Sequence, residues 1–292
     1  MTGNDNPPPL SEARVTIVGL GLMGGSLALA LGDKCASITA VTRRAEGAAD
    51  AVRRGVVTQA TTDLAEAVRE ADVVVPAMPV RAIIALLAEI GPALKPGCLV
   101  MDLGSTKREI VGAMDSLPDS VQAVGGHPMC GKETAGLDTA HVDLFRGRPF
   151  VLCPTLHSRP PAIERAAELV RAAGAHPVIL QAERHDGLVA TSSHLPYVLS
   201  AGLVATAARA EGDDPLMSVL LASGFRDTSR LAGSDATMMR DILLTNREAI
   251  QNSLAGFQTW LAELQALLEA GDADGLMAIL ARVQAGRRRL LS

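Results

Sequence analysis

Short apolar runs rich in β-branched residues alternate with helical patterns over roughly the first 180 residues of the chain. Such runs predict strands. They lie at residues 14–19 (RVTIVG), 37–41 (SITAV), 71–78 (ADVVVPAM), 98–104 (CLVMDLG), 121–124, 148–154 (RPFVLCP) and 176–180 (HPVIL). Because strands that alternate with helices form parallel sheets covered on both faces, this half predicts an α/β fold with a Rossmann-type doubly wound sheet.

The apolar pattern changes near residue 180. From about residue 183 onward, apolar residues recur at helical spacing, and no strand-like alternation remains. We therefore expect a sheet domain at residues 14–180 and an all-helical domain at residues 181–292. The helical half has so few polar core positions that its helices are expected to pack against a second copy of the chain, which predicts a homodimer. Residues 1–13, which include three consecutive prolines, are expected to form a flexible tail.

Composition narrows the classes of function. The chain has 292 residues, 48% of them hydrophobic and 2% aromatic, and a formal net charge of −5. An acidic protein has no overall field that attracts nucleic acid or an anionic membrane, so a small molecule is the expected partner. The four cysteines form no CxxC pair, no signal peptide opens the chain and no apolar stretch appears long enough for a bilayer, so we expect a cytoplasmic protein without a metal site.

A glycine-rich motif follows the first predicted strand. Gly19, Gly21 and Gly24 form GxGxxG, with Leu22 and Met23 in the variable positions and a helical pattern directly after them. In this context the first glycine permits a tight turn, the second lets a pyrophosphate approach the backbone, and the third allows close packing of helix and strand. The motif predicts a dinucleotide cofactor.

The end of the second predicted strand indicates which dinucleotide binds. NAD-binding units place a carboxylate there for the ribose hydroxyls, but this chain has Thr42, Arg43 and Arg44. A hydroxyl and two guanidinium groups suit a 2′-phosphate, so we predict NADP, with NAD kept as a possible cofactor. The alternative interpretation is that these residues only begin a solvated helix.

Three further stretches carry candidate chemistry. Ser105 follows the strand at residues 98–104, and His127 lies in GGHPMCG after the next predicted strand, so both are expected at the carboxyl edge of the sheet, where open α/β sheets bind ligands. The third stretch is SHLPY at residues 193–197, where Pro196 is expected to bend a helix. An imidazole with an ordinary pKa of about 6.5 suits proton removal near neutral pH, so His127 is the candidate base.

Taken together, these motifs resemble those of the prephenate/arogenate dehydrogenase family of tyrosine biosynthesis. The matching stretches are GLGLMGGSLA, DLGSTK, GGHPMCGKETAG, SSHLP and SGFRDTSR, in this order, and the resemblance runs from about residue 15 to the mid-250s. It implies an oxidative decarboxylation, in which a hydride leaves the carbinol carbon of a cyclohexadienol for the nicotinamide and CO2 is lost as the ring becomes aromatic.

The resemblance also implies roles for single residues. His127 matches the histidine that takes the proton of the ring hydroxyl, and Ser105 matches the serine that bonds both this histidine and the hydroxyl. Arg230 matches an arginine that holds a substrate carboxylate, which a planar guanidinium binds in bidentate fashion. His194 and Asp186 match supporting polar residues.

Two positions bear on the substrate. Glu133 matches a family position near the mouth of the site. Tyr197 stands where some prephenate-using members have a histidine that helps to hold the substrate. Together with the TRR segment, this departure makes the chain most similar to NADP-linked arogenate dehydrogenases. A prephenate dehydrogenase and a cyclohexadienyl dehydrogenase that uses both substrates remain alternatives.

Two other classes share parts of this pattern. β-Hydroxyacid dehydrogenases and imine reductases have a similar plan, but they would be expected to present a catalytic lysine on the helical domain. The four lysines here, Lys34, Lys95, Lys107 and Lys132, all lie in the first half. A non-catalytic NADP-binding module is a third possibility, and it would have no reason to keep the Ser105, His127 and Arg230 set.

Overall fold

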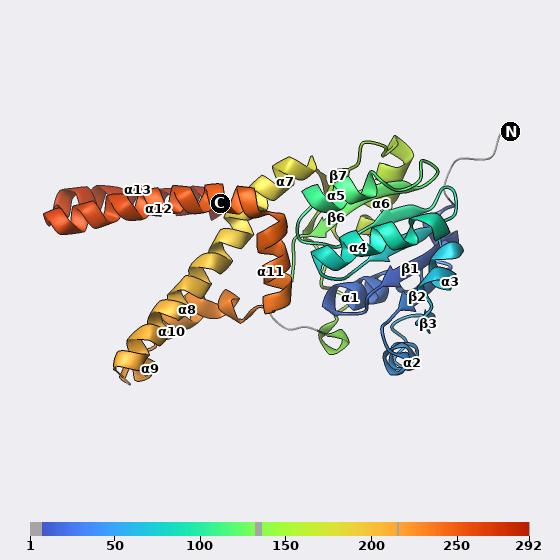
Figure 1. Ribbon diagram of the computed structural model, residues 1–292, viewed down its shortest axis with the longest axis horizontal. Coiled ribbons are helices and arrows are strands. Elements are labelled where there is room, and N and C mark those ends of the chain that lie inside the picture. The colour runs from blue at the N-terminus through green and yellow to red at the C-terminus, as the bar shows by residue number, and fades with distance from the viewer. Residues whose placement is uncertain (1–7, 132–135, 215, 292) are drawn as a thin grey trace. The chain divides into compact units, whose positions relative to one another are not determined.

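The computed structural model describes residues 8–131, 136–214 and 216–291. Eight strands form one sheet in the order β3-β2-β1-β4-β5-β6-β7-β8, and every neighbouring pair is parallel except β6 and β7 (Figure 1). The strands are β1 (Arg14–Val18), β2 (Ser37–Val41), β3 (Gln59–Thr61), β4 (Val73–Pro76), β5 (Leu99–Met101), β6 (Gln122–Pro128), β7 (Pro149–Pro154) and β8 (His176–Ile179). The predicted α/β sheet is confirmed.

Helices cover both faces of the sheet, and two separate apolar cores lie between helices and strands. One core packs against α1 (Leu22–Leu31) and α6 (Pro160–Ala172), and the other against α3 (Leu64–Arg69), α4 (Val80–Ile90) and α5 (Arg108–Met114) (Figure 1). Helix α2 (Ala45–Arg53) contributes Ala51 to the first of these cores. Strands such as VVVP in β4 are buried along their whole length, because a doubly wound sheet exposes neither face.

Strand β6 extends further than the sequence predicts. Its pairing with β5 ends at Val124, but β6 continues to Pro128 because antiparallel β7 pairs with that extension, placing His127 opposite Val151. His127 therefore lies within a strand, beyond the carboxyl end of β5, instead of in a loop. A strand pair holds the imidazole more rigidly than a turn would.

Two other expectations need correction. The strand β3 was not predicted, because three residues of sequence QAT at the sheet edge are too short and too polar to show a period of two. The flexible tail predicted over residues 1–13 does not extend to residues 10–13: Leu10–Glu12 form a 3-10 helix, and Leu10 and Ala13 are buried in a core. These two apolar side chains order a segment whose prolines suggest flexibility.

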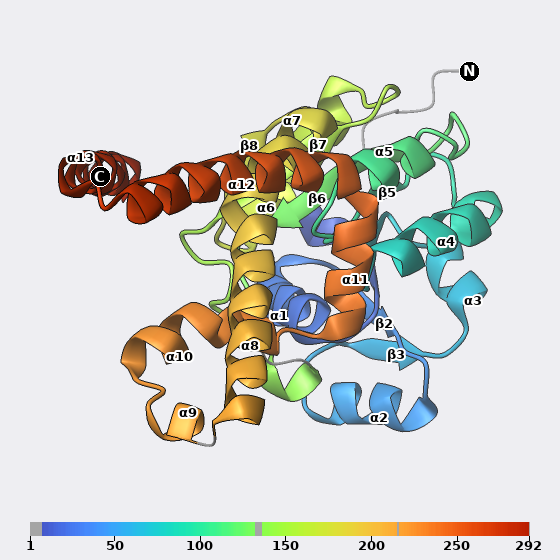
Figure 2. The same cartoon turned by 60° about the vertical axis from the view of Figure 1, so that its left-hand side comes forward.

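The helical half begins with α7 (Ala182–Val189), a π-helical turn at Ala190–His194 and α8 (Leu195–Asp213). Pro196, which is expected to bend a helix, lies in the first turn of α8, directly after the π turn, and the helical run continues through it. The chain then forms α9 (Leu216–Val219) and α10 (Ser223–Ser229), which Figure 2 shows beside α8, and α11 (Ala236–Thr245), which packs against α4. The long helices α12 (Arg247–Ala270) and α13 (Ala273–Leu291) complete it.

The continuous run of α7, the π turn and α8 is apolar over much of its length. Residues 182–212 are long enough and, with a mean hydropathy of 1.3, apolar enough to pass a membrane-span test, which the sequence expectation had excluded. The same run carries the buried polar side chains His185, Asp186 and His194, which belong to the site described below.

Two compact units make up the chain, at residues 1–247 and 248–292. The first contains the sheet together with α7 to α11, so the helices nearest the sheet share one unit with it. The second contains most of α12 and α13, which an ion pair between Arg282 and Glu263 joins at 2.9 Å. The predicted division at residues 180 and 181 falls between β8 and α7 and stays a prediction.

Candidate active site

A cavity of about 560 Å³ opens at the carboxyl edge of the sheet, inside the first compact unit. Its walls are mostly apolar with a few polar groups, as in small-molecule sites. Residues from the sheet half that line it are Gly21, Leu22, Met23, Ala77, Met78, Pro79, Val80, Leu103, Gly104, Ser105, His127, Pro128, Cys130, Gly131 and Gly136. Those from the helical half are Ser192, Ser193, His194, Pro196, Tyr197, Leu231, Ser234, Asp235, Met238, Met239 and Ile242.

Hydrogen bonds hold the helical wall of the cavity in place. Ser200 of α8 accepts the backbone N–H of Ala232 at 2.9 Å, which fixes the 3-10 turn Arg230–Gly233 beside α8. At the end of α11, the hydroxyl groups of Thr106 and Thr245 lie 2.8 Å apart and are both buried. This contact joins α11 to the loop after β5.

The glycine-rich loop forms one end of the cavity. Gly19 has φ +101°, and a Cβ there would lie 2.6 Å from the carbonyl oxygen of Ala77, whereas a Cβ at Gly24 would lie 2.0 Å from that of Gly19. Both positions therefore require glycine for the backbone itself. A Cβ at Gly21 would meet nothing within 4 Å, so this position has open space directly before helix α1. That space beside a helix N-terminus fits a pyrophosphate.

The end of β2 lies next to this loop, since the N–H of Gly19 donates to the carbonyl oxygen of Val41 at 3.0 Å. Thr42 donates its hydroxyl to the carbonyl oxygen of Arg44 at 2.9 Å, and the side chains of Arg43 and Arg44 are exposed. Two guanidinium groups are thus available to a ligand where an NAD-binding unit has its carboxylate.

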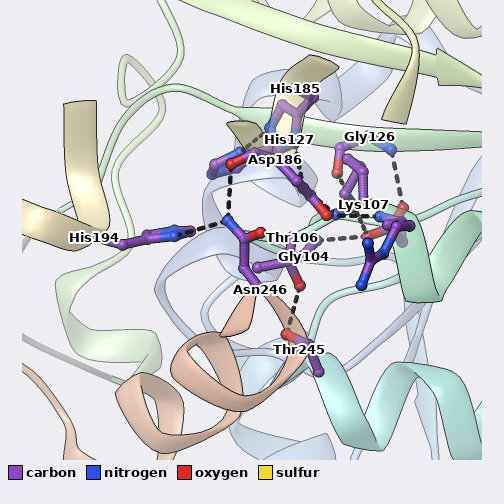
Figure 3. Close-up of polar contacts among 12 residues, drawn as sticks. Gly104, Thr106, Lys107, Gly126, His127, His185, Asp186, His194, Thr245 and Asn246 are labelled. Atoms are coloured by element: carbon purple, nitrogen blue, oxygen red, sulfur yellow. Dashed lines mark hydrogen bonds and ion pairs between the residues drawn. The ribbon is translucent and has the colours of Figure 1, made fainter. Parts of the chain in front are cut away.

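His127 belongs to a chain of buried polar contacts (Figure 3). Its Nδ1 lies 2.8 Å from Nε2 of His185, and Nδ1 of His185 lies 2.8 Å from Oδ1 of Asp186. Asp186 also accepts the backbone N–H groups of Lys107 at 2.7 Å and of Arg108 at 2.9 Å. The carboxylate on α7 is therefore bound to the start of α5, and it anchors the two imidazoles.

The pKa of His127 is well below its ordinary value of 6.5. Burial is the main cause, and the nearness of the basic groups of His185, Lys107 and His194 adds to it. A lowered pKa keeps the imidazole neutral near pH 7, so it has a lone pair with which to accept a proton.

Lys107 lies fully buried beneath the cavity and forms an ion pair with Asp102. Its Nζ also donates to the carbonyl oxygen of Gly126 at 2.6 Å, and the N–H groups of Gly104 and Gly126 donate to Asp102 at 2.7 and 2.9 Å. This network joins the loop after β5 to β6 directly before His127 (Figure 3).

The reason for the paired glycines before His127 differs from the one expected. The sequence suggests that Gly125 and Gly126 make room for a ligand. A Cβ at Gly126 would lie 2.3 Å from the carbonyl oxygen of Asp102, and one at Gly125 would lie 2.9 Å from Val111. These glycines thus make room for the protein's own packing.

His194 lines the cavity and contacts Asn246. The amide nitrogen of Asn246 donates to the carbonyl oxygen of Asp186 at 2.8 Å and lies 3.2 Å from Nδ1 of His194. Because a carbonyl oxygen only accepts, the amide group nearest His194 is the NH2, and Nδ1 of His194 accepts. Burial lowers the pKa of His194 to about 4, with the carboxylate of Asp186 opposing this effect and the nearby basic group of His185 adding to it.

The structure places several predicted site residues at this cavity and others elsewhere. Ser105, His127, His194 and Tyr197 line it, together with Gly21, Leu22 and Met23. No hydrogen bond joins Ser105 to His127, whose Nδ1 instead faces His185. Asp186 does not line the cavity; it lies behind the wall that contains His127 and contacts His185.

Arg230 has an exposed side chain and does not line the cavity, although Leu231 does. Glu133 lies outside the described residues. The binding roles of Arg230 and Glu133 therefore stay predictions.

Sequence reasoning missed His185, Lys107 and Asn246 as members of this cluster. Two of these had a usable signal: Lys107 ends the DLGSTK stretch, and His185 directly precedes Asp186 in the helical run that also carries His194. Asn246 lies 60 residues from Asp186, so only the folded chain brings the two together.

Comparison with known proteins connects this geometry to a family. Residues 27–179 match the family model for the nucleotide-binding domain of prephenate dehydrogenase. Residues 181–282 match the model for the dimerization domain of prephenate dehydrogenase.

Curated relatives match most of the chain. A prephenate dehydrogenase of Bacillus subtilis is 34% identical, and the match covers 90% of this chain and 72% of that protein. A cyclohexadienyl dehydrogenase of Zymomonas mobilis is 33% identical over 94% of this chain and 95% of its own length.

Solved structures are also similar. A prephenate dehydrogenase from A. aeolicus, in complex with hydroxyphenyl propionate and NAD+, has a TM-score of 0.87 at 28% identity and covers 97% of this chain and 100% of its own. An arogenate dehydrogenase from Synechocystis has a TM-score of 0.80 at 28% identity, covering 95% and 99%.

Proposed function

This chain belongs to the prephenate/arogenate dehydrogenase family of oxidoreductases, and from that premise we propose that it converts arogenate to tyrosine with NADP. The reaction removes a hydride from the ring carbinol carbon and breaks the bond to the ring carboxylate. The electron pair of that bond makes the ring aromatic, and CO2 leaves. The observation that carries the proposal is His127, held from behind by His185, on the wall of an apolar cavity that also contains the glycine-rich loop.

The residues present fit a nicotinamide dinucleotide. Gly21 leaves open space at the start of α1, and the loop residues Leu22 and Met23 line the same cavity as His127. When bound there, the nicotinamide accepts the hydride. The exposed Arg43 and Arg44 support NADP, because their guanidinium groups suit a 2′-phosphate and no carboxylate stands at that position.

His127 removes the proton that the hydroxyl group must lose. As the carbinol carbon becomes a carbonyl carbon, the hydroxyl proton passes to Nε2 of His127, and the phenol oxygen recovers a proton after CO2 has left. Ser105 lines the same wall and supplies a hydroxyl that bonds the substrate oxygen. The low pKa of His127 suits this task, since a base must be unprotonated before the substrate arrives.

Polar groups of the helical half hold the substrate's acidic groups. His194, with Nδ1 occupied by Asn246, presents an Nε2–H donor, and Tyr197 adds a hydroxyl. Arg230, at the start of the 3-10 turn that carries the lining residue Leu231, holds a carboxylate. The apolar remainder of the wall packs against the ring and excludes water.

The second candidate substrate is prephenate, and a related possibility is an enzyme that uses both. The names of the Bacillus subtilis and Zymomonas mobilis relatives favour these alternatives, and Tyr197 favours arogenate. Prephenate and arogenate differ only in a keto or an amino group on the side chain, so few contacts separate them.

We also propose a homodimer formed through the helical half. This part of the chain matches a dimerization domain, and large apolar side chains of α13 face solvent, with Met277 70% and Leu280 54% exposed. Such exposure is typical of an interface surface. Light scattering coupled to size exclusion is expected to give twice the chain mass of 30.3 kDa, and a monomer at micromolar concentration would contradict the dimer.

The test of substrate and cofactor is a two-by-two assay of kcat/KM. Arogenate and prephenate are each combined with NADP and NAD, and nucleotide reduction is followed by absorbance. Arogenate with NADP is expected to give the highest value. A clear preference for prephenate would refute the substrate proposal, and a higher value with NAD would refute the cofactor proposal.

A variant tests the proton acceptor. His127→Asn is expected to lower kcat about 10²–10⁴-fold, the usual contribution of a positioned base, with the Kd for NADP unchanged. A near-normal kcat would remove His127 from this role. Binding of NADP without turnover of either substrate by the unaltered protein would instead favour a non-catalytic module.

A further inference from the structure

We propose that His185 is a positioning residue that fixes the proton of His127 on Nδ1, so that the unprotonated Nε2 is the nitrogen presented to the cavity. The inference rests on the proposed function, because it explains how His127 becomes a base. It starts from the chain of contacts from His127 through His185 to Asp186, which lies behind the cavity wall (Figure 3).

The first step is the state of His185. Its Nδ1 lies 2.8 Å from Oδ1 of Asp186, which is a carboxylate oxygen that already accepts the N–H of Lys107. The other carboxylate oxygen accepts the N–H of Arg108. An ionised carboxylate has only lone pairs to offer, so Nδ1 of His185 must carry a proton.

The second step infers the position of the proton on His127 from that on His185. A neutral imidazole that carries its proton on Nδ1 has its lone pair on Nε2. Nε2 of His185 lies 2.8 Å from Nδ1 of His127, so His127 must donate there and keep its proton on Nδ1. The two rings meet at an interplanar angle of 76°, with 5.0 Å between their centroids.

The competing arrangement requires a charged His185. A doubly protonated His185 would donate to Nδ1 of His127, whose own proton would then sit on Nε2 and remove the base. His185 is 1% exposed, so this charge would be fully desolvated. The charged and titratable groups around the pair are Asp186, Lys107, Asp102 and His194. Asp102 is paired with Lys107, and Asp186 already accepts the backbone N–H groups of Lys107 and Arg108 in addition to facing His185.

His185 therefore determines whether Nε2 of His127 is available to accept a proton. The lone pair on Nε2 of His127 is available only while Nε2 of His185 accepts the N–H of His127. Removing His185 leaves the N–H of His127 without its buried acceptor, and the ring is then free to adopt the inactive tautomer.

Two variants separate this role from simple packing. His185→Phe keeps a ring of similar size in contact with His127 but offers no acceptor, whereas His185→Gln keeps an amide oxygen that accepts from Nδ1 of His127. With arogenate or prephenate, whichever is the better substrate, His185→Phe is expected to lower kcat about 10²-fold or more, and His185→Gln to remain within about tenfold of the unaltered protein. In both variants KM and the Kd for NADP are expected to stay unchanged.

A loss in His185→Gln as large as that in His185→Phe, with both variants folded, would overturn the proposal. So would a normal kcat in His185→Phe. Thermal unfolding and NADPH fluorescence titration establish that each variant is folded and binds cofactor.

A spectroscopic measurement tests the proton position without turnover or substitution of His185. The protein contains six histidines, so nitrogen-15 labelling of histidine gives few signals, and His127→Asn identifies those of His127. At neutral pH, His127 is expected to show a protonated Nδ1 and an unprotonated Nε2. A proton on Nε2 would overturn the proposal. This readout stands even if neither substrate is turned over, so failure of the proposed function and failure of this inference are distinguishable.

Discussion

The buried ion pair between Lys107 and Asp102 makes a demanding prediction about stability. Lys107→Met removes the ammonium group and keeps an unbranched chain of similar length. The side chains of Lys107 and Asp102 are both 0% exposed, so the carboxylate of Asp102 would lose its charged partner without gaining water. The carbonyl oxygen of Gly126 would lose a donor as well.

The size of the effect follows from what remains around Asp102. Breaking a buried pair by removing one partner costs about 3–5 kcal/mol of unfolding free energy. Asp102 retains the N–H groups of Gly104 and Gly126, which compensate part of its charge. We therefore expect the lower end, about 3 kcal/mol, equivalent to a fall in Tm of roughly 6–12 °C.

The assay is urea-induced unfolding and differential scanning calorimetry at one fixed protein concentration, because assembly would also shift Tm. Lys95→Met is the matched control. Its pair with Asp72 is partly exposed, at 27% and 12% for the two side chains, and should be worth no more than about 1 kcal/mol. If the two variants lose unfolding free energies that differ by less than about 1 kcal/mol, the reasoning about the desolvated charge of Asp102 is refuted.

Three further predictions test other parts of the site. Arg230→Ala is expected to raise the KM of the substrate more than it lowers kcat, because the proposed contact of the guanidinium with a carboxylate would exist in both ground and transition states; an unchanged KM would place that contact elsewhere. Gly21→Val is expected to fold with a near-normal Tm, because nothing lies within 4 Å of its Cβ, but to weaken NADP binding, and unaltered affinity would contradict the pyrophosphate site. The folded pKa of His194, about 4, is below its ordinary value of 6.5, so the unfolded chain binds the proton more tightly. The stability from this group is complete above pH 6.5 and is lost as pH falls toward 4. His194→Gln should show a shallower loss over that range in urea titrations, and an unchanged slope would argue against burial as the cause.

Local patterns predicted much of this protein. The apolar runs correspond to seven of the eight strands of the sheet, and the glycine-rich loop, Ser105, His127, His194 and Tyr197 all reach one cavity. These features follow from short-range physics, because strand burial, turn geometry and the edge where parallel strands end all depend on neighbouring residues. The motifs that resemble the prephenate/arogenate dehydrogenases are local in the same sense.

Long-range contacts decided what the patterns left open. The antiparallel strand β7 converts the segment around His127 from a loop into a strand, and no local signal specifies the direction of a partner strand. The short edge strand β3 likewise depends on its neighbour β2.

The chemistry of His127 shows most clearly which properties follow from the sequence and which depend on the tertiary structure. The sequence by itself determined that a histidine stands at the carboxyl edge of a dinucleotide-binding sheet, because that follows from the order of strands and motifs along the chain. Which nitrogen of the ring carries the proton depends on His185, 58 residues away, and on the Asp186 carboxylate held by the start of α5. Hydrogen-bond direction and desolvation are properties of atoms brought within about 3 Å of one another, so only the tertiary structure could decide them.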